Sequence, residues 1–197
     1  LTAITDPEDV ATLHFLDSAA LLTLESFSGK SVVDVGTGAG FPGIPLKIVF
    51  PDLKITLLDS LNKRIKFLNQ VILDLSLNNI SALHGRAEDL AQQKEYREHY
   101  DFCVSRAVAN LATLSEYCLP FVKKKGYFIS YKSEKITEEY EQAKKAIKIL
   151  GGNYKNQVEF YLPQSDIYRN LFIIEKIDVT PKKYPRKAGM PSKEPII

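Results

Sequence analysis

The sequence predicts an α/β fold with a mostly parallel sheet, helices on both faces, and an antiparallel pair of strands at its C-terminal end. Between residues 31 and 150, short apolar runs alternate with amphipathic helical patterns, which is the arrangement of a parallel sheet with helical connections. Two later apolar runs have no helix between them, so we expect them to pair antiparallel. Sheets of this kind bind ligands at the carboxyl ends of their strands.

The elements expected before residue 100 begin with a helix. At residues 6–9 an aspartate can cap the first turn, a proline suits the first helical position, and two acidic residues favour the positive end of the helix. The first apolar run after it ends in glycines, as a buried strand before a tight turn does. The expected elements that follow are strands at Ser31–Val35, Lys54–Asp59 and Ile80–His84, and an amphipathic helix over 63–76.

The clearest element beyond residue 100 is a helix that stops before Gly151. We expect Thr137 to cap it, because acidic residues follow in the first turn and lysines crowd its end. Pro120 is expected to end the preceding helix. The expected elements are a strand over 101–105, a helix over 111–119, a strand over 127–132, a helix over 137–150 and strands over 158–162 and 171–177.

The chain length indicates a single domain. Its 197 residues are enough to bury one core. We expect an N-terminal helical cover over residues 1–28, a sheet core over 29–178 and a basic tail over 179–197. Because residue 1 is leucine, we also expect the chain to be a piece of a longer product. No feature of the sequence requires a partner subunit, so a monomer is expected.

The composition argues against several classes of protein. No apolar run is long enough to span a bilayer and no signal-peptide pattern is present, so we expect a cytoplasmic protein without membrane contact. Cys103 and Cys118 lack metal-ligand or C-x-x-C spacing, and we expect both to be reduced core residues. His14, His84 and His99 show no ligand spacing either, and His14 is expected to be a packed or surface side chain.

The strongest functional signal is the glycine-rich sequence after the first predicted strand. Glycines there let the backbone turn sharply and let a ligand approach the main chain. Gly38, Gly40 and Gly43 form the G-x-G-x-x-G pattern of dinucleotide sites. If the chain instead leaves the strand at Gly36, the pattern is G-x-G-x-G, and Pro42 disturbs the helix start that would bind a pyrophosphate. We favour the second interpretation.

An acidic residue ends the second predicted strand. Asp59 follows Gly36 by 23 residues, and a carboxylate at this place can accept hydrogen bonds from a ribose diol. The two features occur in register, so the sequence predicts a nucleoside-containing cofactor rather than a purely structural turn. They do not by themselves distinguish one such cofactor from another.

The tail has a charge that the net charge of +2 for the whole chain conceals. Residues 179–197 contain five basic residues and one acidic residue, a net charge of +4, together with four prolines. One interpretation is a solvated charged terminus. The other is an extended arm whose basic side chains follow a phosphate backbone.

Four motifs resemble the glucose-inhibited division protein B family. They are D-x-G-x-G-x-G followed by Phe-Pro-Gly-Ile-Pro at 34–45, Gly-Arg-Ala-Glu at 85–88, Ser-Arg-Ala-Val-Ala at 105–109, and Arg-Lys-Ala-Gly-Met-Pro-Ser-Lys at 186–193. The resemblance covers essentially the whole chain. It implies a Rossmann-like bacterial methyltransferase that uses S-adenosyl-L-methionine to modify nitrogen-7 of a guanine in small-subunit ribosomal RNA, either as free RNA or in the assembled small subunit.

The resemblance also implies the residues of the site. It places cofactor contacts at Gly36, Phe41, Ala87, Glu88 and Arg106, and general methyltransferase geometry adds Asp34 and Asp59. Contacts with substrate RNA are expected from Arg186, Lys187 and Lys193 in the tail and from Lys132 at the end of the fifth strand. Two alternatives stay open, because Arg106 could be an ion-pair partner at the sheet edge and Glu88 a loop acid.

The expected chemistry needs no catalytic base. Nitrogen-7 of guanine carries a free lone pair, so catalysis would come from holding donor and acceptor in line, and no residue is expected to act as acid, base or metal ligand. Two other functions remain possible. An NAD-dependent oxidoreductase is favoured only by the formal glycine pattern, and a non-catalytic RNA-binding protein on the same fold would leave the intact glycine loop unexplained.

Overall fold

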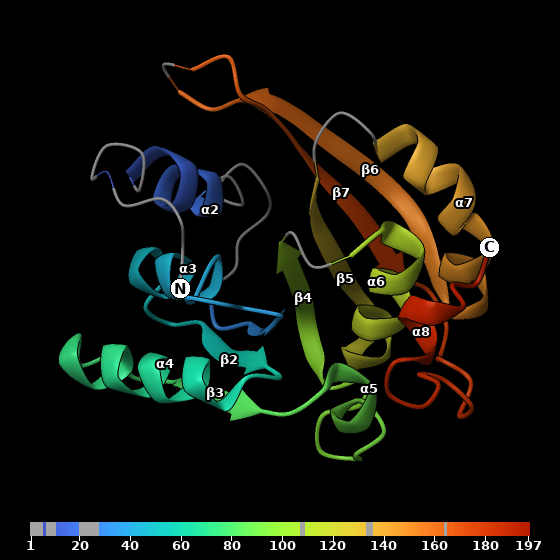
Figure 1. The fold of residues 1–197 in the computed structure, drawn as a ribbon, viewed down its shortest axis with the longest axis horizontal. Helices are drawn as coiled ribbons and strands as arrows, with labels where there is room; N and C mark the ends of the chain where they lie inside the picture. The colour runs from blue at the N-terminus through green and yellow to red at the C-terminus, as the bar shows by residue number, and fades with distance from the viewer. Residues whose placement is uncertain (1–5, 7–10, 20–27, 107–108, 133–135, 164) are drawn as a thin grey trace.

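Seven strands form one sheet in the computed structural model, which describes residues 6, 11–19, 28–106, 109–132, 136–163 and 165–197. The strands are β1 (Ser31–Val35), β2 (Lys54–Asp59), β3 (Ile80–His84), β4 (Tyr100–Arg106), β5 (Val122–Lys132), β6 (Gly152–Tyr161) and β7 (Tyr168–Lys176). They lie in the order β3-β2-β1-β4-β5-β7-β6 (Figure 1). β1 to β5 pair in parallel, and β7 is antiparallel to both β5 and β6. The predicted sheet and its antiparallel C-terminal pair are confirmed.

The strand order reverses between β1 and β4. From β1 the chain adds β2 and β3 outward on one side, then returns to pair β4 and β5 on the other. The register places Val32 of β1 beside Phe102 of β4 and Lys54 of β2 beside Ser31 of β1. Open parallel sheets form a crevice outside the carboxyl ends of the strands at such a switch point, so the topology alone indicates where a ligand would bind.

The two faces of the sheet carry separate cores because alternate side chains point to opposite sides. Val33 of β1 packs in the core formed with α6 (Leu111–Cys118) and α7 (Ile136–Ile149). Its neighbour Val32 packs in the core formed with α3 (Gly43–Val49) and α4 (Asn62–Asp74). Helices therefore cover both faces, as predicted, and β1 is buried on both sides.

The strand boundaries differ from prediction where polar residues interrupt the apolar pattern. β5 begins at Val122 rather than at 127, because the fully buried Val122 pairs with Tyr100 while the three lysines between are exposed. β6 begins at Gly152 rather than at 158, and the four residues after Gly152 are exposed. β7 ends at Lys176. This side chain is fully buried, which a charged residue type does not predict.

The helices also show differences from prediction. α7 begins at Ile136, so Thr137 lies inside the helix and is not its cap. Asn110 caps α6 by accepting a hydrogen bond from the Thr113 amide. α6 continues into a short turn, η3 (Leu119–Phe121), that includes Pro120. A helical segment formed by η1 (Ala11–Leu16) and α2 (Asp17–Ala19) contacts the sheet, where the Tyr131 hydroxyl of β5 donates to the Ser18 carbonyl at 2.9 Å. Of the helix start expected at residues 6–9, residues 7–9 lie outside the described residues. A single turn, α5 (Ala87–Leu90), follows β3.

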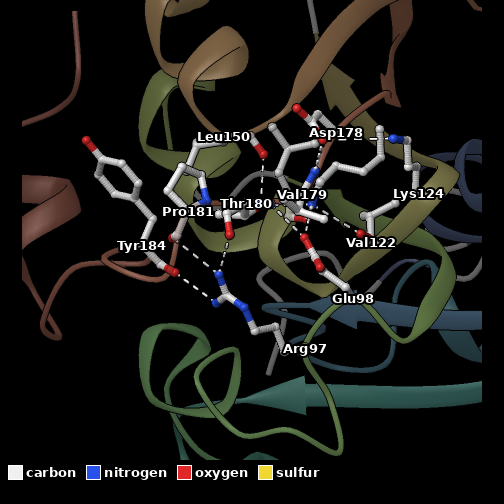
Figure 2. A network of polar contacts seen from close by, with 12 residues as sticks. Arg97, Glu98, Val122, Lys124, Leu150, Asp178, Val179, Thr180, Pro181 and Tyr184 are labelled. Atoms are coloured by element: carbon white, nitrogen blue, oxygen red, sulfur yellow. Dashed lines mark hydrogen bonds and ion pairs between the residues drawn. The ribbon is translucent and has the colours of Figure 1, made fainter.

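The tail is not the extended arm that its prolines suggested. It folds back against the sheet core and includes a helical turn, α8 (Met190–Lys193). Arg97 organises it, since the guanidinium donates to the carbonyl oxygens of Thr180 at 2.8 Å, Tyr184 at 2.9 Å and Pro181 at 3.3 Å (Figure 2). Thr180 and Tyr184 are buried. Backbone carbonyl groups leave no trace in a residue pattern, which is why the sequence did not predict this packing.

A buried lysine stands at the start of this folded tail. Lys176 Nζ donates to the Leu119 carbonyl at 2.7 Å, the Val122 carbonyl at 3.2 Å and Thr180 Oγ1 at 2.8 Å. Glu98 Oε1 lies 3.2 Å from the same nitrogen. Burial lowers the pKa of Lys176 to about 8, against the opposing effect of Glu98.

The described residues include no helix with the length and apolar character to cross a membrane.

Candidate cofactor and substrate site

The glycine loop leaves β1 through a series of left-handed backbone conformations. The φ angles of Gly36, Gly38 and Gly40 are +73°, +62° and +100°, which residues with a Cβ rarely adopt. The amides of Gly36 and Thr37 both donate to the Leu58 carbonyl of β2, at 2.9 and 3.1 Å. The loop is therefore fixed against β2 and turns its backbone toward the carboxyl end of the sheet.

Asp34 lies beneath this loop. Its Oδ2 accepts hydrogen bonds from Thr37 Oγ1 at 2.7 Å and from the Gly43 amide at 2.9 Å. The side chain is fully buried, and burial raises its pKa to about 6, although both hydrogen bonds oppose that shift. Asp34 is not among the residues that line the adjacent cavity. We predicted it as a cofactor contact, but its place in the structure is that of a brace joining both ends of the loop.

Asp59 holds the loop from the other side. Its Oδ2 accepts from the Gly38 amide at 3.0 Å and from Arg64 at 3.1 Å, and its Oδ1 accepts from the Leu61 amide at 2.9 Å. The carboxylate also lines the cavity. Because an ionised carboxylate can accept about four hydrogen bonds, Asp59 has capacity left for a ligand hydroxyl.

A cavity of about 640 Å³ lies at the carboxyl ends of β1 to β4. Six of the seven predicted cofactor contacts line it, with Asp34 the exception. The six are Gly36, Phe41, Asp59, Ala87, Glu88 and Arg106. They come from strand ends and the segments that follow them, up to 70 residues apart in sequence, and the strand switch point brings them together.

One end of the cavity is built around Arg106. Its Nη1 lies 3.1 Å from Asp17 Oδ2, and its Nη2 lies 3.2 Å from His14 Nδ1. The guanidinium also stands 5.3 Å from the centre of the Phe41 ring. His14 stacks on the same ring, with the ring centroids 4.7 Å apart. Asp17 is buried and accepts from Arg169 through its other oxygen. Arg106 is therefore an ion-pair partner, and it also lines the cavity in which a cofactor contact is predicted.

The other end is built around Glu88. This buried carboxylate accepts a hydrogen bond from the Gly189 amide of the tail, at 2.8 Å through Oε1. Gly189, Ser192 and Tyr117 of α6 also line the cavity there. Glu88 is therefore more than a loop acid, since it joins the cavity to the C-terminal tail.

The four residues predicted to contact RNA fall into two pairs. Lys132 Nζ donates to the Ala109 carbonyl at 2.8 Å and to Glu139 Oε2 at 2.6 Å, and only 10% of its side chain is exposed. Arg186 is bound to Glu116, with Nη2 at 2.7 Å from Oε2. Lys187 and Lys193 are exposed. The first two are thus engaged inside the protein, and the second two reach solvent.

Sequence reasoning missed several residues at the cavity. His14 was expected to be a packed or surface side chain, yet it lines the cavity, and only its tertiary contact with Phe41 reveals this. Arg86, Tyr117, Gly189 and Ser192 were missed as well. Arg86 could have been found, because it stands beside Ala87 directly after β3. In the part of the chain that the structure describes, no group of histidine, cysteine and acidic residues is placed to hold a metal ion.

Comparison with known proteins gives consistent matches. The family model described as GidB, rRNA small subunit methyltransferase G, matches residues 1–168. Ribosomal RNA small subunit methyltransferase G from Lachnoclostridium phytofermentans is 56% identical over 198 residues, which cover this whole chain and 82% of the relative. The protein of the same name from Clostridium tetani is 52% identical over 197 residues, with the same coverage.

Solved structures resemble the fold. A SAM-dependent methyltransferase from Aquifex aeolicus matches with a TM-score of 0.62 at 19% identity, covering 86% of this chain and 93% of that protein. TrmN from Thermus thermophilus matches with a TM-score of 0.60 at 17% identity, covering 82% of this chain and 48% of that protein. These likenesses support the Rossmann-like methyltransferase fold. The matches give no support to an oxidoreductase or to a non-catalytic RNA-binding protein.

Proposed function

The chain belongs to the rRNA small subunit methyltransferase G family, and on that basis we propose that it transfers a methyl group from S-adenosyl-L-methionine to nitrogen-7 of a guanine in small-subunit ribosomal RNA. The observation that carries this proposal is the cavity at the strand switch point, where the glycine loop, two acidic side chains and Arg106 converge. The family name supports the substrate class, and the motif resemblance supports the target atom. An enzyme with this substrate would act in the cytoplasm.

The residues of the cavity fit this cofactor. A volume of about 640 Å³ lies within the range of about 300–1,000 Å³ that small-molecule sites occupy. The carboxylates of Asp59 and Glu88 can accept hydrogen bonds from the hydroxyl and amino groups of a nucleoside, and Arg106 can pair with a carboxylate at the opposite end. When bound, S-adenosyl-L-methionine supplies an electrophilic methyl group on a sulfonium.

The chain's own residues would act by holding the reactants in place. Asp59 and Arg106 are themselves fixed by hydrogen bonds to the loop amides and to Asp17, so neither needs to reorganise when a ligand binds. The stacked rings of His14 and Phe41 line the cavity beside Arg106. Positioning of this kind can contribute about 7–11 kcal/mol in favourable systems. The acceptor nitrogen carries its own lone pair, so no side chain has to remove a proton.

The substrate RNA would meet basic side chains around the mouth of the cavity. Lys187, Lys193 and Arg86 are exposed, and Arg86 lines the cavity itself. We assign them to phosphate contacts, which supply most of the affinity of such interfaces. Arg186 and Lys132 would contribute by supporting the segments next to these residues.

The proposal is tested by methyl transfer. Small ribosomal subunits from bacteria that lack this modification are incubated with the chain and tritiated S-adenosyl-L-methionine, and the RNA is then digested to nucleosides. We expect label in 7-methylguanosine. A parallel incubation with protein-free ribosomal RNA distinguishes free RNA from the assembled particle as the substrate.

The Arg106→Ala variant provides the control. It should lose at least tenfold of the activity, because the variant removes a charge that faces the cavity. Label in a different nucleoside would contradict the assignment of nitrogen-7. An absence of label with both substrates would contradict the proposed function.

A further inference from the structure

A segment of the tail forms one wall of the cofactor cavity. Gly189 and Ser192 line the cavity, although they follow Glu88 by about a hundred residues. The amide of Gly189 donates to Glu88 Oε1 at 2.8 Å. Its φ of +85° is a left-handed conformation that glycine adopts without steric cost. A residue with a Cβ would be strained in this conformation, so the contact with Glu88 depends on glycine at position 189.

Two contacts with α6 hold this segment in place. Arg186 binds Glu116 through three pairs of side-chain atoms, Nε to Oε1 at 3.0 Å, Nε to Oε2 at 3.1 Å and Nη2 to Oε2 at 2.7 Å, and its amide donates to Oε1 at 2.7 Å. Glu116 is almost completely buried. Thr113 Oγ1 donates to the Pro191 carbonyl at 3.1 Å. Because the same helix supplies Tyr117 to the cavity, displacement of the segment would open this end of the cavity.

The outer side of the segment is basic. Lys187 and Lys193 flank Gly189 and are exposed, whereas Gly189 and Ser192 contribute to the cavity lining. Eight residues thus present a ligand-facing surface on one side and two positive charges on the other. The match to the family model ends at residue 168, so residues 186–193 lie outside the matched part of the chain.

We propose that residues 186–193 are a strap shared by the cofactor site and the RNA site, so that each ligand strengthens the binding of the other. The inference rests on the proposed function. Phosphates bound to Lys187 and Lys193 restrict the strap to the conformation in which Gly189 contacts Glu88. The second ligand then loses less conformational entropy when it binds, and the coupling must act equally in both directions.

The first experiment measures binding of tritiated S-adenosylhomocysteine to the full chain by equilibrium dialysis without RNA. Arg186→Gln releases the strap from α6 and should weaken binding at least fivefold. Ser192→Ala changes an exposed cavity residue whose hydroxyl contacts the Gly189 carbonyl at 3.1 Å, and it should weaken binding two- to fivefold. Lys155→Gln is the matched control, because it breaks an ion pair with Glu175 on the far edge of the sheet and should leave binding unchanged.

The second experiment repeats the dialysis with saturating small ribosomal subunits at fixed salt. In the wild type, the subunits should tighten S-adenosylhomocysteine binding at least threefold, and S-adenosylhomocysteine should tighten subunit binding by the same factor. Arg186→Gln should abolish this coupling. A thermal melt monitored by circular dichroism identifies any variant that has unfolded, and Ser192→Ala then carries the test.

The outcomes separate the strap from the proposed function. If the wild type binds S-adenosylhomocysteine while both strap variants bind it equally well, the strap is wrong and the function stands. If the variants lose affinity but the subunits do not change cofactor binding, the strap belongs to the cofactor site alone and the coupling is wrong. A wild type that binds no S-adenosylhomocysteine contradicts both proposals.

Discussion

At the scale of the single residue, Arg106 brings a positive charge to a cavity that is proposed to hold a positively charged sulfonium. Asp17 offsets this repulsion, because its buried carboxylate lies 3.1 Å from Arg106 and 3.1 Å from Arg169 through different oxygens. Like charges interact strongly where water is largely excluded. Asp17 does not line the cavity, so it acts on a ligand only through Arg106 and is a positioning residue.

The Asp17→Asn variant should therefore weaken cofactor binding. We expect the Kd for S-adenosylhomocysteine to rise about tenfold, equivalent to about 1.4 kcal/mol, because asparagine keeps the size of the side chain but not its charge. Arg169→Gln removes the other partner of Asp17 and should change the Kd less than threefold. Isothermal titration calorimetry measures both. Equal losses in the two variants would show general damage to the N-terminal helix and would contradict a positioning role.

Residues at the ends of strands were predictable, and residues contributed by distant segments were not. Asp59, Glu88 and Arg106 line the cavity as expected, because each stands at or just beyond the end of a strand whose apolar pattern is local. Asp34 was predicted to contact the cofactor because it stands two residues before Gly36 of the glycine loop. It shares the face of β1 that packs on α3, so its carboxylate meets the Gly43 amide instead of the cavity.

At the scale of the element, prediction succeeded where an apolar run is short and stops where pairing stops. β1, β2 and β3 have the predicted bounds for this reason, although β3 lies at an edge of the sheet and is only partly buried. β6 lies at the edge of the sheet, where one side of the strand meets solvent, and its first half therefore carries no apolar pattern. Edge strands are held by backbone pairing with their neighbour, and that pairing leaves little mark in the residue pattern.

Lys176 is the residue through which β7, η3 and the tail are joined. Its pKa falls from 10.5 to about 8 in the folded chain, mainly through burial. Between these values the unfolded chain binds the proton more tightly, so the free energy of unfolding rises with pH over this window. The full effect is about 3 kcal/mol for a shift of this size.

We therefore expect the wild type to gain stability between pH 8 and 9.5 relative to a Lys176→Met variant, which has no group to titrate there. Urea unfolding at pH 7, 8, 9 and 9.5 measures this difference. The variant will be less stable overall, because the carbonyl groups of Leu119 and Val122 lose a donor. Lys155→Met, at an exposed position, should follow the wild-type curve. Parallel curves for wild type and Lys176→Met would exclude the lowered pKa.

At the scale of the whole molecule, the positive charge of the tail is divided by the fold. Arg186 is used to bind α6, whereas Lys187 and Lys193 face solvent. The sequence indicated a basic segment but could not show which basic residues are bound within the protein and which are exposed. The partner of Arg186 is Glu116, which lies 70 residues away in sequence. Prolines and lysines together suggested an extended peptide, and the ion pair with a buried glutamate produced a folded one.

The double variant Lys187→Ala, Lys193→Ala should bind small ribosomal subunits at least tenfold less tightly at moderate salt. The logarithm of its binding constant should also fall less steeply with the logarithm of the salt concentration, with a slope smaller by about 1–2, because up to two phosphate contacts are lost. Filter binding between 50 and 300 mM salt measures this. Lys145→Ala, Lys148→Ala on α7 is the charge-matched control, and an equal loss there would indicate an effect of net charge alone.

The contact between Gly189 and Glu88 also has a consequence for the time at which the site is finished. The two residues are 101 positions apart, and translation adds about 5–20 residues each second. Glu88 therefore leaves the peptidyl-transferase centre about 5–20 s before its partner. During that interval β1 to β4 can assemble, but one wall of the cavity does not yet exist. A nascent chain thus has an open pocket between the formation of β4 and the addition of Gly189, and the pocket cannot be completed before the strap has been translated.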